Sequence, residues 1–382
     1  MTMISASAAA TAAAPLPLGS NPEPAAAILA AAGQLLPHLE RGERVAAAAL
    51  RAAMETAFGA SDATGAWDWK TAYDACEAAA VLFLRKYGRA LFRKAGSPAA
   101  RLSAVSKIAN LLPTHTRRSA ESQTFQQFST PIPLGLVAAH AAAITPADRV
   151  LEPSAGTGLL AILAEIAGGA LVLNELADTR ANLLSLLFPA ISVTRFDAAQ
   201  IDDHLDPAVM PSVVLMNPPF SVMANVEGRM ADAAYRHVGS ALARLAPGGR
   251  LVAITGASFA PDNPAWRDAF IRLQARGRVV FSAVIDGPVY AKHGTTIETR
   301  LTVIDKRPAD DPVVFPATPG IAPDVATLLG WLNEHMPERP AVDPSVVVPA
   351  IAPSTPRSVR GYINRVAKAG PATALMAEPE GL

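Results

Sequence analysis

The sequence predicts an α/β protein with a mainly parallel central sheet and a helical region at its N-terminal end. Two observations lead to this fold class. In the middle of the 382-residue chain, short apolar runs alternate with amphipathic stretches long enough for helices. Ahead of them, the chain shows helical patterning without such runs. Strands that alternate with helices are typical of βαβ units, whose helices cover both faces of a parallel sheet.

The helical region is expected to form a domain over residues 22–118, after an Ala/Ser/Thr-rich start (1–21) that we expect to be disordered. Its strongest helix has Asp68 placed to favour the helix start and a Gly-Ser-Pro stop signal at 96–98. The predicted helices are 22–58, 67–95 and 99–112.

The sheet domain is expected to cover residues 119–310 and to contain seven strands. A Gly/Lys/His/Thr-rich segment (287–296), and no helix, separates the last two strands, which we therefore expect to form an antiparallel pair. Beyond them, residues 311–382 are proline-rich and are interpreted as a linker or tail, apart from one short helix at 323–335. The predicted strands are Arg149–Glu152, Ala170–Asn174, 192–196, 213–217, 250–255, 279–285 and 300–305.

Composition narrows the function classes. Net charge is zero, so global charge neither favours nor excludes a nucleic-acid partner. The single Cys76 excludes an intramolecular disulfide and a cysteine-based metal cluster. No apolar stretch is long enough to span a bilayer, and the start of the chain lacks a signal-peptide pattern, so a cytoplasmic protein is expected. No metal is expected either, because His115, His140, His204, His237 and His293 show no metal-ligand spacing.

A glycine turn, EPSAGTG at 152–158, follows the first predicted strand and precedes a predicted helix at Leu159–Ala167. Glycines in such a turn permit close approach of the backbone to a nucleotide-like ligand. The third glycine of a dinucleotide-binding turn is missing, and the Glu152 carboxylate would repel a pyrophosphate. The ammonium group of S-adenosylmethionine tolerates this carboxylate, so the turn favours that cofactor. Its predicted contacts are Glu152, Pro153, Ser154, Ala155, Gly156 and Gly158.

Acids at the next two strand ends extend the predicted cofactor site. Glu175 ends the second strand and is placed to accept hydrogen bonds from both ribose hydroxyls. Asp197 follows the third strand and is placed to accept from the adenine amine, with Phe196 or Ala198 beside the ring. A solvated strand end is the alternative for each acid alone.

The tetrapeptide Asn217-Pro218-Pro219-Phe220 ends the fourth predicted strand and is the predicted catalytic site. The side-chain oxygen of Asn217, which also contacts the cofactor, and the carbonyl of Pro218 are two acceptors for the hydrogens of a planar amine. The prolines stiffen the loop and so hold these acceptors in place before a substrate arrives. Phe220 is placed to stack on the planar group. This arrangement indicates methyl transfer to an amino nitrogen.

Residues 125–307 resemble the amino-methylating branch of the class I methyltransferases, most closely the N6-adenine DNA methyltransferases. The resemblance rests on the tetrapeptide, on FQQFSTP at 125–131 and on GTTIETR at 294–300. It implies the seven-stranded Rossmann-like sheet of that class, in the circular order of its gamma type. It also implies that Phe128 and Thr130, in the same segment as Pro131, contact the methionine part of the cofactor.

The whole chain also resembles the methyltransferase region of bacterial strawberry-notch-like proteins, in which a helicase region follows. This sequence has no Gly-Lys-Thr or Gly-Lys-Ser ATP-binding loop. The resemblance therefore implies a helicase partner or a missing helicase domain.

DNA is the predicted partner, because a target adenine must be flipped out of a duplex and a basic surface would hold it. Residues 65–118 contain ten lysines or arginines and three acids, although a solvated helix face explains such a cluster equally well. Three alternatives remain. An RNA guanine-N2 methyltransferase typically has histidine where Ser221 stands, and a protein-glutamine N5 methyltransferase prefers tyrosine in place of Phe220. A cofactor-binding scaffold for a helicase would predict a degenerate catalytic loop.

Overall fold

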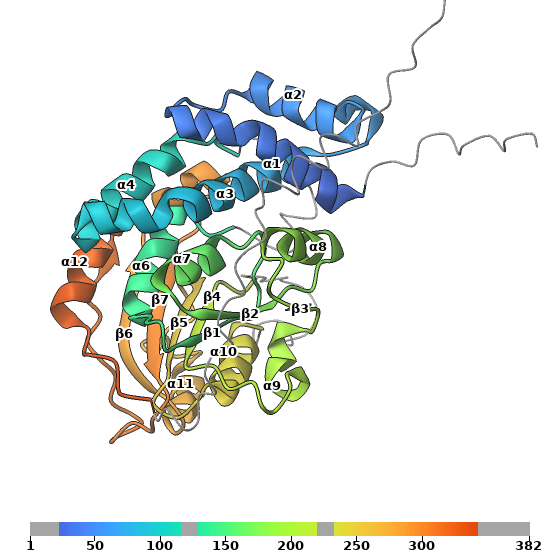
Figure 1. Cartoon of the computed structure of the whole chain (residues 1–382). Coiled ribbons are helices and arrows are strands. Elements are labelled where there is room, and N and C mark those ends of the chain that lie inside the picture. The colour runs from blue at the N-terminus through green and yellow to red at the C-terminus, as the bar shows by residue number, and fades with distance from the viewer. Residues whose placement is uncertain (1–22, 116–128, 220–232, 343–382) are drawn as a thin grey trace, which may run out of the picture.

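The computed structural model describes residues 23–115, 129–219 and 233–342 (Figure 1). Its strands are β1 Arg149–Glu152, β2 Ala170–Asn174, β3 Val193–Thr194, β4 Val213–Met216, β5 Arg250–Gly256, β6 Arg278–Ile285, β7 Thr299–Asp305 and β8 Ile321–Ala322. They form one sheet in the order β3-β2-β1-β4-β5-β7-β6-β8. The first five strands pair in parallel, whereas β7 runs antiparallel between β5 and β6. The predicted α/β class and the terminal antiparallel pair are confirmed. The short eighth strand, parallel to β6, was not predicted.

The described helices are α1 Pro24–Arg41, α2 Ala47–Phe58, α3 Trp69–Ala95, α4 Pro98–Leu111, α6 Ile132–Ala142, α7 Leu159–Ala167, α8 Asp178–Leu187, α9 Ile201–His204, α10 Ala233–Arg244, α11 Arg267–Gln274 and α12 Val325–His335, with 3-10 turns η1 Asp62–Thr64, η2 Ala198–Gln200 and η3 Gly287–His293. In Figure 1, α1 to α4 form a layer in which α1 lies over α8, α3 over α7 and α4 over α6, while α2 packs on α1. One apolar core joins this layer to α7 and α8, a second lies between the sheet, α6 and α12, and a third lies between the sheet and α9 to α11.

Local chemistry explains the boundaries of the N-terminal helices. The side chain of Asp68 accepts a hydrogen bond from the backbone N–H of Thr71 at 2.8 Å, which confirms the predicted start of α3. Ser97 caps α4 in the same way, with Pro98 in the first turn. The helical pattern over 22–58 is interrupted at Gly42, whose φ of 70° ends α1 and separates it from α2.

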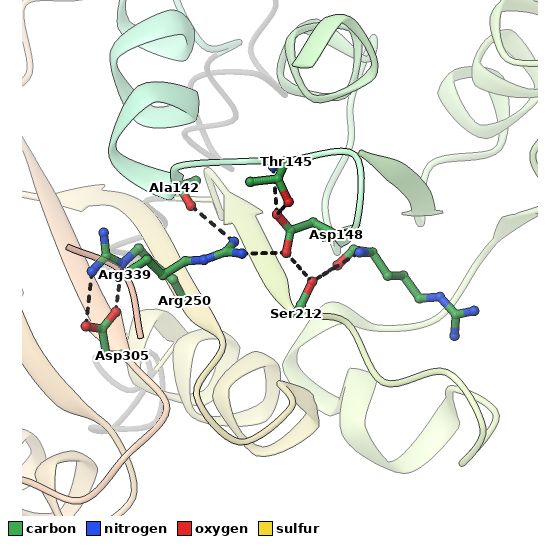
Figure 2. A network of polar contacts seen from close by, with 8 residues as sticks. Ala142, Thr145, Asp148, Ser212, Arg250, Asp305 and Arg339 are labelled. Atoms are coloured by element: carbon green, nitrogen blue, oxygen red, sulfur yellow. Dashed lines mark hydrogen bonds and ion pairs between the residues drawn. The ribbon is translucent and has the colours of Figure 1, made fainter. Parts of the chain in front are cut away.

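The segment after β7 returns to the sheet. Its predicted helix is confirmed as α12, which Asp324 caps through the backbone N–H of Thr327. Arg339 then forms an ion pair with the buried Asp148 at 2.7 Å (Figure 2). Residues 321–339 therefore pack with the sheet, whereas the domain division expected from the sequence stays a prediction. No described helix combines the length and the apolar character that crossing a membrane requires.

A buried ion pair joins the two central antiparallel strands. Arg250 of β5 and Asp305 of β7 lie directly opposite one another, and their side chains are 0% and 1% exposed. Two charge-assisted hydrogen bonds of 2.7 and 3.1 Å connect them (Figure 2). The guanidinium also donates to the carbonyls of Ala141 and Pro337, so one side chain links β5, β7, α6 and the segment after α12.

Replacing Asp305 by alanine is expected to destabilise the fold by about 3–5 kcal/mol, because the Arg250 charge stays buried without its counter-ion. Urea unfolding followed by circular dichroism measures this loss. The double replacement Arg250→Met and Asp305→Leu is expected to recover most of the stability, because no buried charge then remains. The matched control is Asp310→Ala, whose partner Arg278 is 42% exposed and whose loss should change stability by about 1 kcal/mol or less. Similar losses for Asp305→Ala and Asp310→Ala would contradict this account.

Candidate functional site

A pocket lies at the carboxyl ends of β1, β2 and β4, the edge at which parallel α/β sheets bind ligands. It brings together most of the residues predicted from the sequence. Those on its lining are Thr130, Glu152, Pro153, Ser154, Ala155, Gly156, Glu175, Phe196, Asp197, Ala198, Asn217, Pro218 and Pro219. Pro131 lines a neighbouring cavity instead, and Gly158 is not on the lining. Phe128 and Phe220 lie outside the described residues.

The two glycines of the turn between β1 and α7 serve different purposes. Gly156 has a φ of 55°, and an added Cβ there would meet nothing within 4 Å, so the backbone is open to a ligand. At Gly158 the φ is 85°, and an added Cβ would lie 2.6 Å from the ring of Phe188. Gly158 is therefore required by packing, whereas Gly156 exposes its backbone to the pocket.

The amide of Asn174, at the end of β2, holds three parts of the pocket together. It is 0% exposed, and sequence reasoning did not single it out. Its nitrogen donates to the carbonyls of Pro153 and Phe196 at 2.8 and 2.9 Å. Its oxygen accepts from the Thr194 hydroxyl and from the Phe196 backbone N–H, both at 2.8 Å. All four hydrogen-bonding positions of the amide are thus used, and the glycine turn is fixed relative to the end of β3.

The side chain of Glu152 is a buried acid with an unused acceptor. It is 3% exposed, and its Oε2 atom has no hydrogen-bond partner among the described residues. Burial raises the pKa of this carboxyl well above its usual range, and the nearby Glu175 raises it further. A carboxylate in this position gains a favourable partner when a cationic or hydrogen-donating group enters the pocket.

Both carboxylate oxygens of Glu175 bind backbone N–H groups, of Gly156 and of Ala177, each at 2.8 Å. Asp197 similarly accepts from the backbone N–H of Ala199 at 2.9 Å. Each ionised carboxylate has about four acceptor positions, so these bonds orient the groups and leave capacity for a ligand. The ring of Phe196, beside Asp197, stacks on His204 at 5.2 Å between centroids.

Asn217 is held at the end of β4 by a second chain segment. Its amide nitrogen donates to the hydroxyl of Thr130 at 2.9 Å, and Thr130 is itself buried. The fully buried Tyr290 of η3 is also hydrogen-bonded to the side chain of Asn217. Burial raises the pKa of the Tyr290 phenol, so it stays protonated, and Asn217 opposes that shift by hydrogen bonding. The Thr-Pro segment and Asn217, far apart in the sequence, therefore meet in the pocket.

The N-terminal helix α3 contacts two residues of the pocket lining, which sequence reasoning missed. Arg180 of α8 lies on the lining and forms a mostly buried ion pair with Asp74 of α3 at 2.8 Å. Glu77, one turn further along α3, accepts a 2.6 Å hydrogen bond from the hydroxyl of Thr157 in the glycine turn. Acids at i and i+3 on an apolar, alanine-rich helix are the sequence signal for this contact, since such a helix rarely buries an unpaired carboxylate.

His237 of α10 is another lining residue that the sequence did not indicate as part of the site. Burial lowers its pKa, and the neighbouring Arg236 lowers it further, while Asp197 opposes the shift. Its Nδ1 atom has no hydrogen-bond partner among the described residues. A neutral imidazole is thus available at the side of the pocket that carries Asp197.

Comparison with known proteins finds likeness in fold. No protein-family model matches the sequence, and no curated protein matches it. Among solved structures, TrmN from Thermus thermophilus is 21% identical with a TM-score of 0.37, over 49% of this chain and 52% of TrmN. The type I restriction enzyme EcoKI M protein is 16% identical with a TM-score of 0.39, over 75% of this chain and 68% of that one. A type I restriction-modification methyltransferase subunit from Streptococcus thermophilus is 16% identical with a TM-score of 0.38, over 55% and 48%. This chain thus spans about half the length of two of these three structures.

Replacing Glu152 by glutamine is expected to remove part of the pH dependence of stability. Because the folded pKa of Glu152 lies above its value of 4.5 in an unfolded chain, the folded state binds this proton more tightly. The protein therefore loses stability as pH rises from about 4.5 through the folded pKa, by about 1.4 kcal/mol per unit of pKa difference. Urea unfolding should show that the glutamine variant is more stable, relative to the unchanged protein, at pH 8 than at pH 5. The exposed Glu334→Gln is the control, and an equal difference at both pH values would refute this account.

Proposed function

We propose that this protein is an S-adenosylmethionine-dependent methyltransferase that methylates an exocyclic amine, with adenine N6 in DNA as its substrate. One observation supports the proposal above the others. Asn217, followed by two prolines, lies in the same pocket as a glycine turn and two strand-end acids, and Thr130 orients its amide. This combination suits a cofactor with one ammonium, one ribose and one adenine group, next to a planar amine.

The residues of the pocket fit the polar groups of that cofactor. The unpartnered Oε2 atom of Glu152 offers a buried acceptor for the ammonium group. Glu175 is oriented by the backbone of the glycine turn and offers acceptors for the ribose hydroxyls. Asp197 offers an acceptor for the adenine amine beside the ring of Phe196. When bound, the cofactor supplies an electrophilic methyl group on a sulfonium sulfur.

The chain's own contribution to the reaction is placement of the amine. The lone pair of an aromatic amine is delocalised, and acceptors directed at its hydrogens make the nitrogen more tetrahedral and stabilise the developing positive charge. In this proposal the acceptors are the side chain of Asn217 and the carbonyl of Pro218. Thr130 and the proline pair hold them in position in advance, so most of the acceleration comes from orientation. As the N–C bond forms, the S–C bond breaks and leaves a neutral thioether, and the methylated amine then releases one proton to bulk water.

The substrate rests on the motif resemblance rather than on the basic cluster of the N-terminal helices. Several of those cations have partners inside the protein. Arg85 forms an ion pair with Glu165 at 3.1 Å, and Lys86 pairs with Glu40. Arg101 donates to the carbonyl of Phe92. These contacts show that part of the basic cluster pairs with groups inside the protein rather than with a nucleic acid. The helicase partner stays a prediction.

The substrate class is decided by incubating the protein with labelled S-adenosylmethionine and, separately, unmethylated DNA, total RNA or a bacterial protein extract. Mass analysis of the digested products should identify N6-methyladenine from DNA. N2-methylguanine from RNA or N5-methylglutamine from protein would assign a different substrate class and would leave the proposed cofactor and catalytic sites unchanged. Cofactor binding without label in any acceptor would contradict the enzyme proposal and favour a scaffold.

Replacing Asn217 by alanine is expected to lower kcat by about 100- to 1000-fold, the usual effect of losing one oriented transition-state contact. Equilibrium binding of S-adenosylmethionine should change little. Asp197→Asn should show the opposite pattern, with binding about 10- to 100-fold weaker, because an amide keeps the Ala199 contact but replaces a charged acceptor. Asn333→Ala, on α12, serves as the control. Unchanged turnover in the Asn217 variant would remove this mechanism.

A further inference from the structure

Outside the pocket, the side chains of Glu77, His115 and His293 gather at the junction of three chain segments. They come from α3, from the segment after α4 and from η3. One ligand atom of each lies within 4.8 Å of the other two. The cluster borders a cavity that Ser106 and Asn110 also line.

We propose that Glu77, His115 and His293 bind a divalent transition-metal ion such as Zn²⁺, with a water molecule in the fourth position. Two imidazoles and one carboxylate form a ligand set that Zn²⁺ takes, and imidazole selects transition metals over Mg²⁺ and Ca²⁺. The cavity that the three side chains line would give water access to such a site. The proposal is independent of methyl transfer, since neither the cofactor nor the substrate enters it.

Both histidines are held in the neutral form that a metal requires. Burial, together with the neighbouring His115 and Lys292, lowers the pKa of His293 to about 3. Burial likewise lowers the pKa of His115 to about 4, with Arg180 and Lys292 adding to the shift. At neutral pH each imidazole therefore offers a lone pair. Burial raises the pKa of the Glu77 carboxyl to about 7, so this ligand would release its proton when a metal binds.

No hydrogen bond joins Glu77 to His293. The Glu77 carboxylate accepts hydrogen bonds from Thr157 and Ser129, and its Oε1 atom lies 4.0 Å from Nδ1 of His293. That separation is too long for a hydrogen bond, and the buried Nδ1 atom has no hydrogen-bond partner among the described residues. Two ligand atoms on a tetrahedral Zn²⁺ lie about 3.3 Å apart, given bonds of about 2.0 Å. Small side-chain rotations close the difference.

The neighbouring charges oppose a cation only in part. Lys292 donates its ammonium hydrogens to the carbonyls of Ala109 and Leu112, at 2.9 and 3.2 Å. Arg180 is paired with Asp74 at 2.8 Å. Both positive charges therefore have acceptors of their own. They lower the affinity relative to an isolated site of this composition, and they also keep the histidines unprotonated.

The surrounding aromatic rings fix the orientation of the ligands. The ring of His115 stacks on Tyr73 of α3 at 4.0 Å between centroids, and His293 meets His115 edge to face at 4.9 Å. Tyr290, which lies on the Asn217 amide, belongs to the same turn as His293. A bound ion would therefore fasten η3 to α3 and restrain the residue that supports the proposed catalytic amide.

Metal binding is tested on the full-length protein without an affinity tag, stripped of metal with a chelator. Equilibrium dialysis against Zn²⁺ should give one ion per chain, and Co²⁺ should give the visible absorption of a site with nitrogen and oxygen ligands. The double variant His115→Asn and His293→Asn should lose both signals, as judged on samples with an unchanged circular dichroism spectrum. His335→Asn, on a half-exposed side chain of α12, should retain them.

Wild-type protein that fails to bind one Zn²⁺ per chain at saturation would overturn the proposal without any variant. Equal binding by the double variant would also overturn it and assign the ion to another place. A Co²⁺ spectrum with a strong thiolate band would do the same, because it would point to the nearby Cys76. If the double variant does not fold, the conservative His293→Gln variant replaces it, with at least tenfold weaker Zn²⁺ binding expected.

Discussion

The pocket depends on one buried amide, that of Asn174. A buried polar group without a partner destabilises a fold by about 1–3 kcal/mol, so an amide placed between two segments forces those segments into the positions that satisfy it. Asn174 has four hydrogen bonds to the glycine turn and to the end of β3. The next residue, Glu175, then binds the backbone of Gly156. These hydrogen bonds fix the positions of the strand-end acids relative to one another, even if the loops are not rigid by themselves.

The helical layer is part of the same construction. Asp74 and Glu77 of α3 are buried and bind Arg180 and Thr157, which belong to the pocket wall and the glycine turn. The shared core that contains α1 to α3 also contains Ala155 of the turn and residues of α7. Removing the layer would expose this core and leave Arg180 without its counter-ion. We infer that the layer is required for the shape of the pocket, whatever its role toward a substrate.

The sequence predicts the strands, their alternation with helices and most of the pocket lining, because these features are local. A glycine turn after an apolar run, and an acid at each following strand end, converge wherever parallel strands share one edge. Contacts between distant segments were not predictable in this way. His115 and His293 lack metal-ligand spacing in the sequence, yet the fold brings them together with Glu77. The eighth strand is two residues long and carries no periodicity that separates it from a loop. Within the turn itself, sequence alone does not distinguish Gly158, required by packing on Phe188, from Gly156, open to the pocket.

Two buried carboxylates, those of Glu152 and Glu77, lie on opposite sides of the glycine turn, and they differ in their hydrogen-bond partners. Glu152 faces the pocket with an unpartnered oxygen, whereas Glu77 lies on the other side and is already bonded to Thr157. Burial raises the pKa of both, that of Glu77 to about 7. Burying an acid costs desolvation free energy, and a few hydrogen bonds within the protein offset that cost only in part. Retaining two such acids beside one turn is therefore physically consistent with positive or hydrogen-donating groups arriving at each from outside the chain.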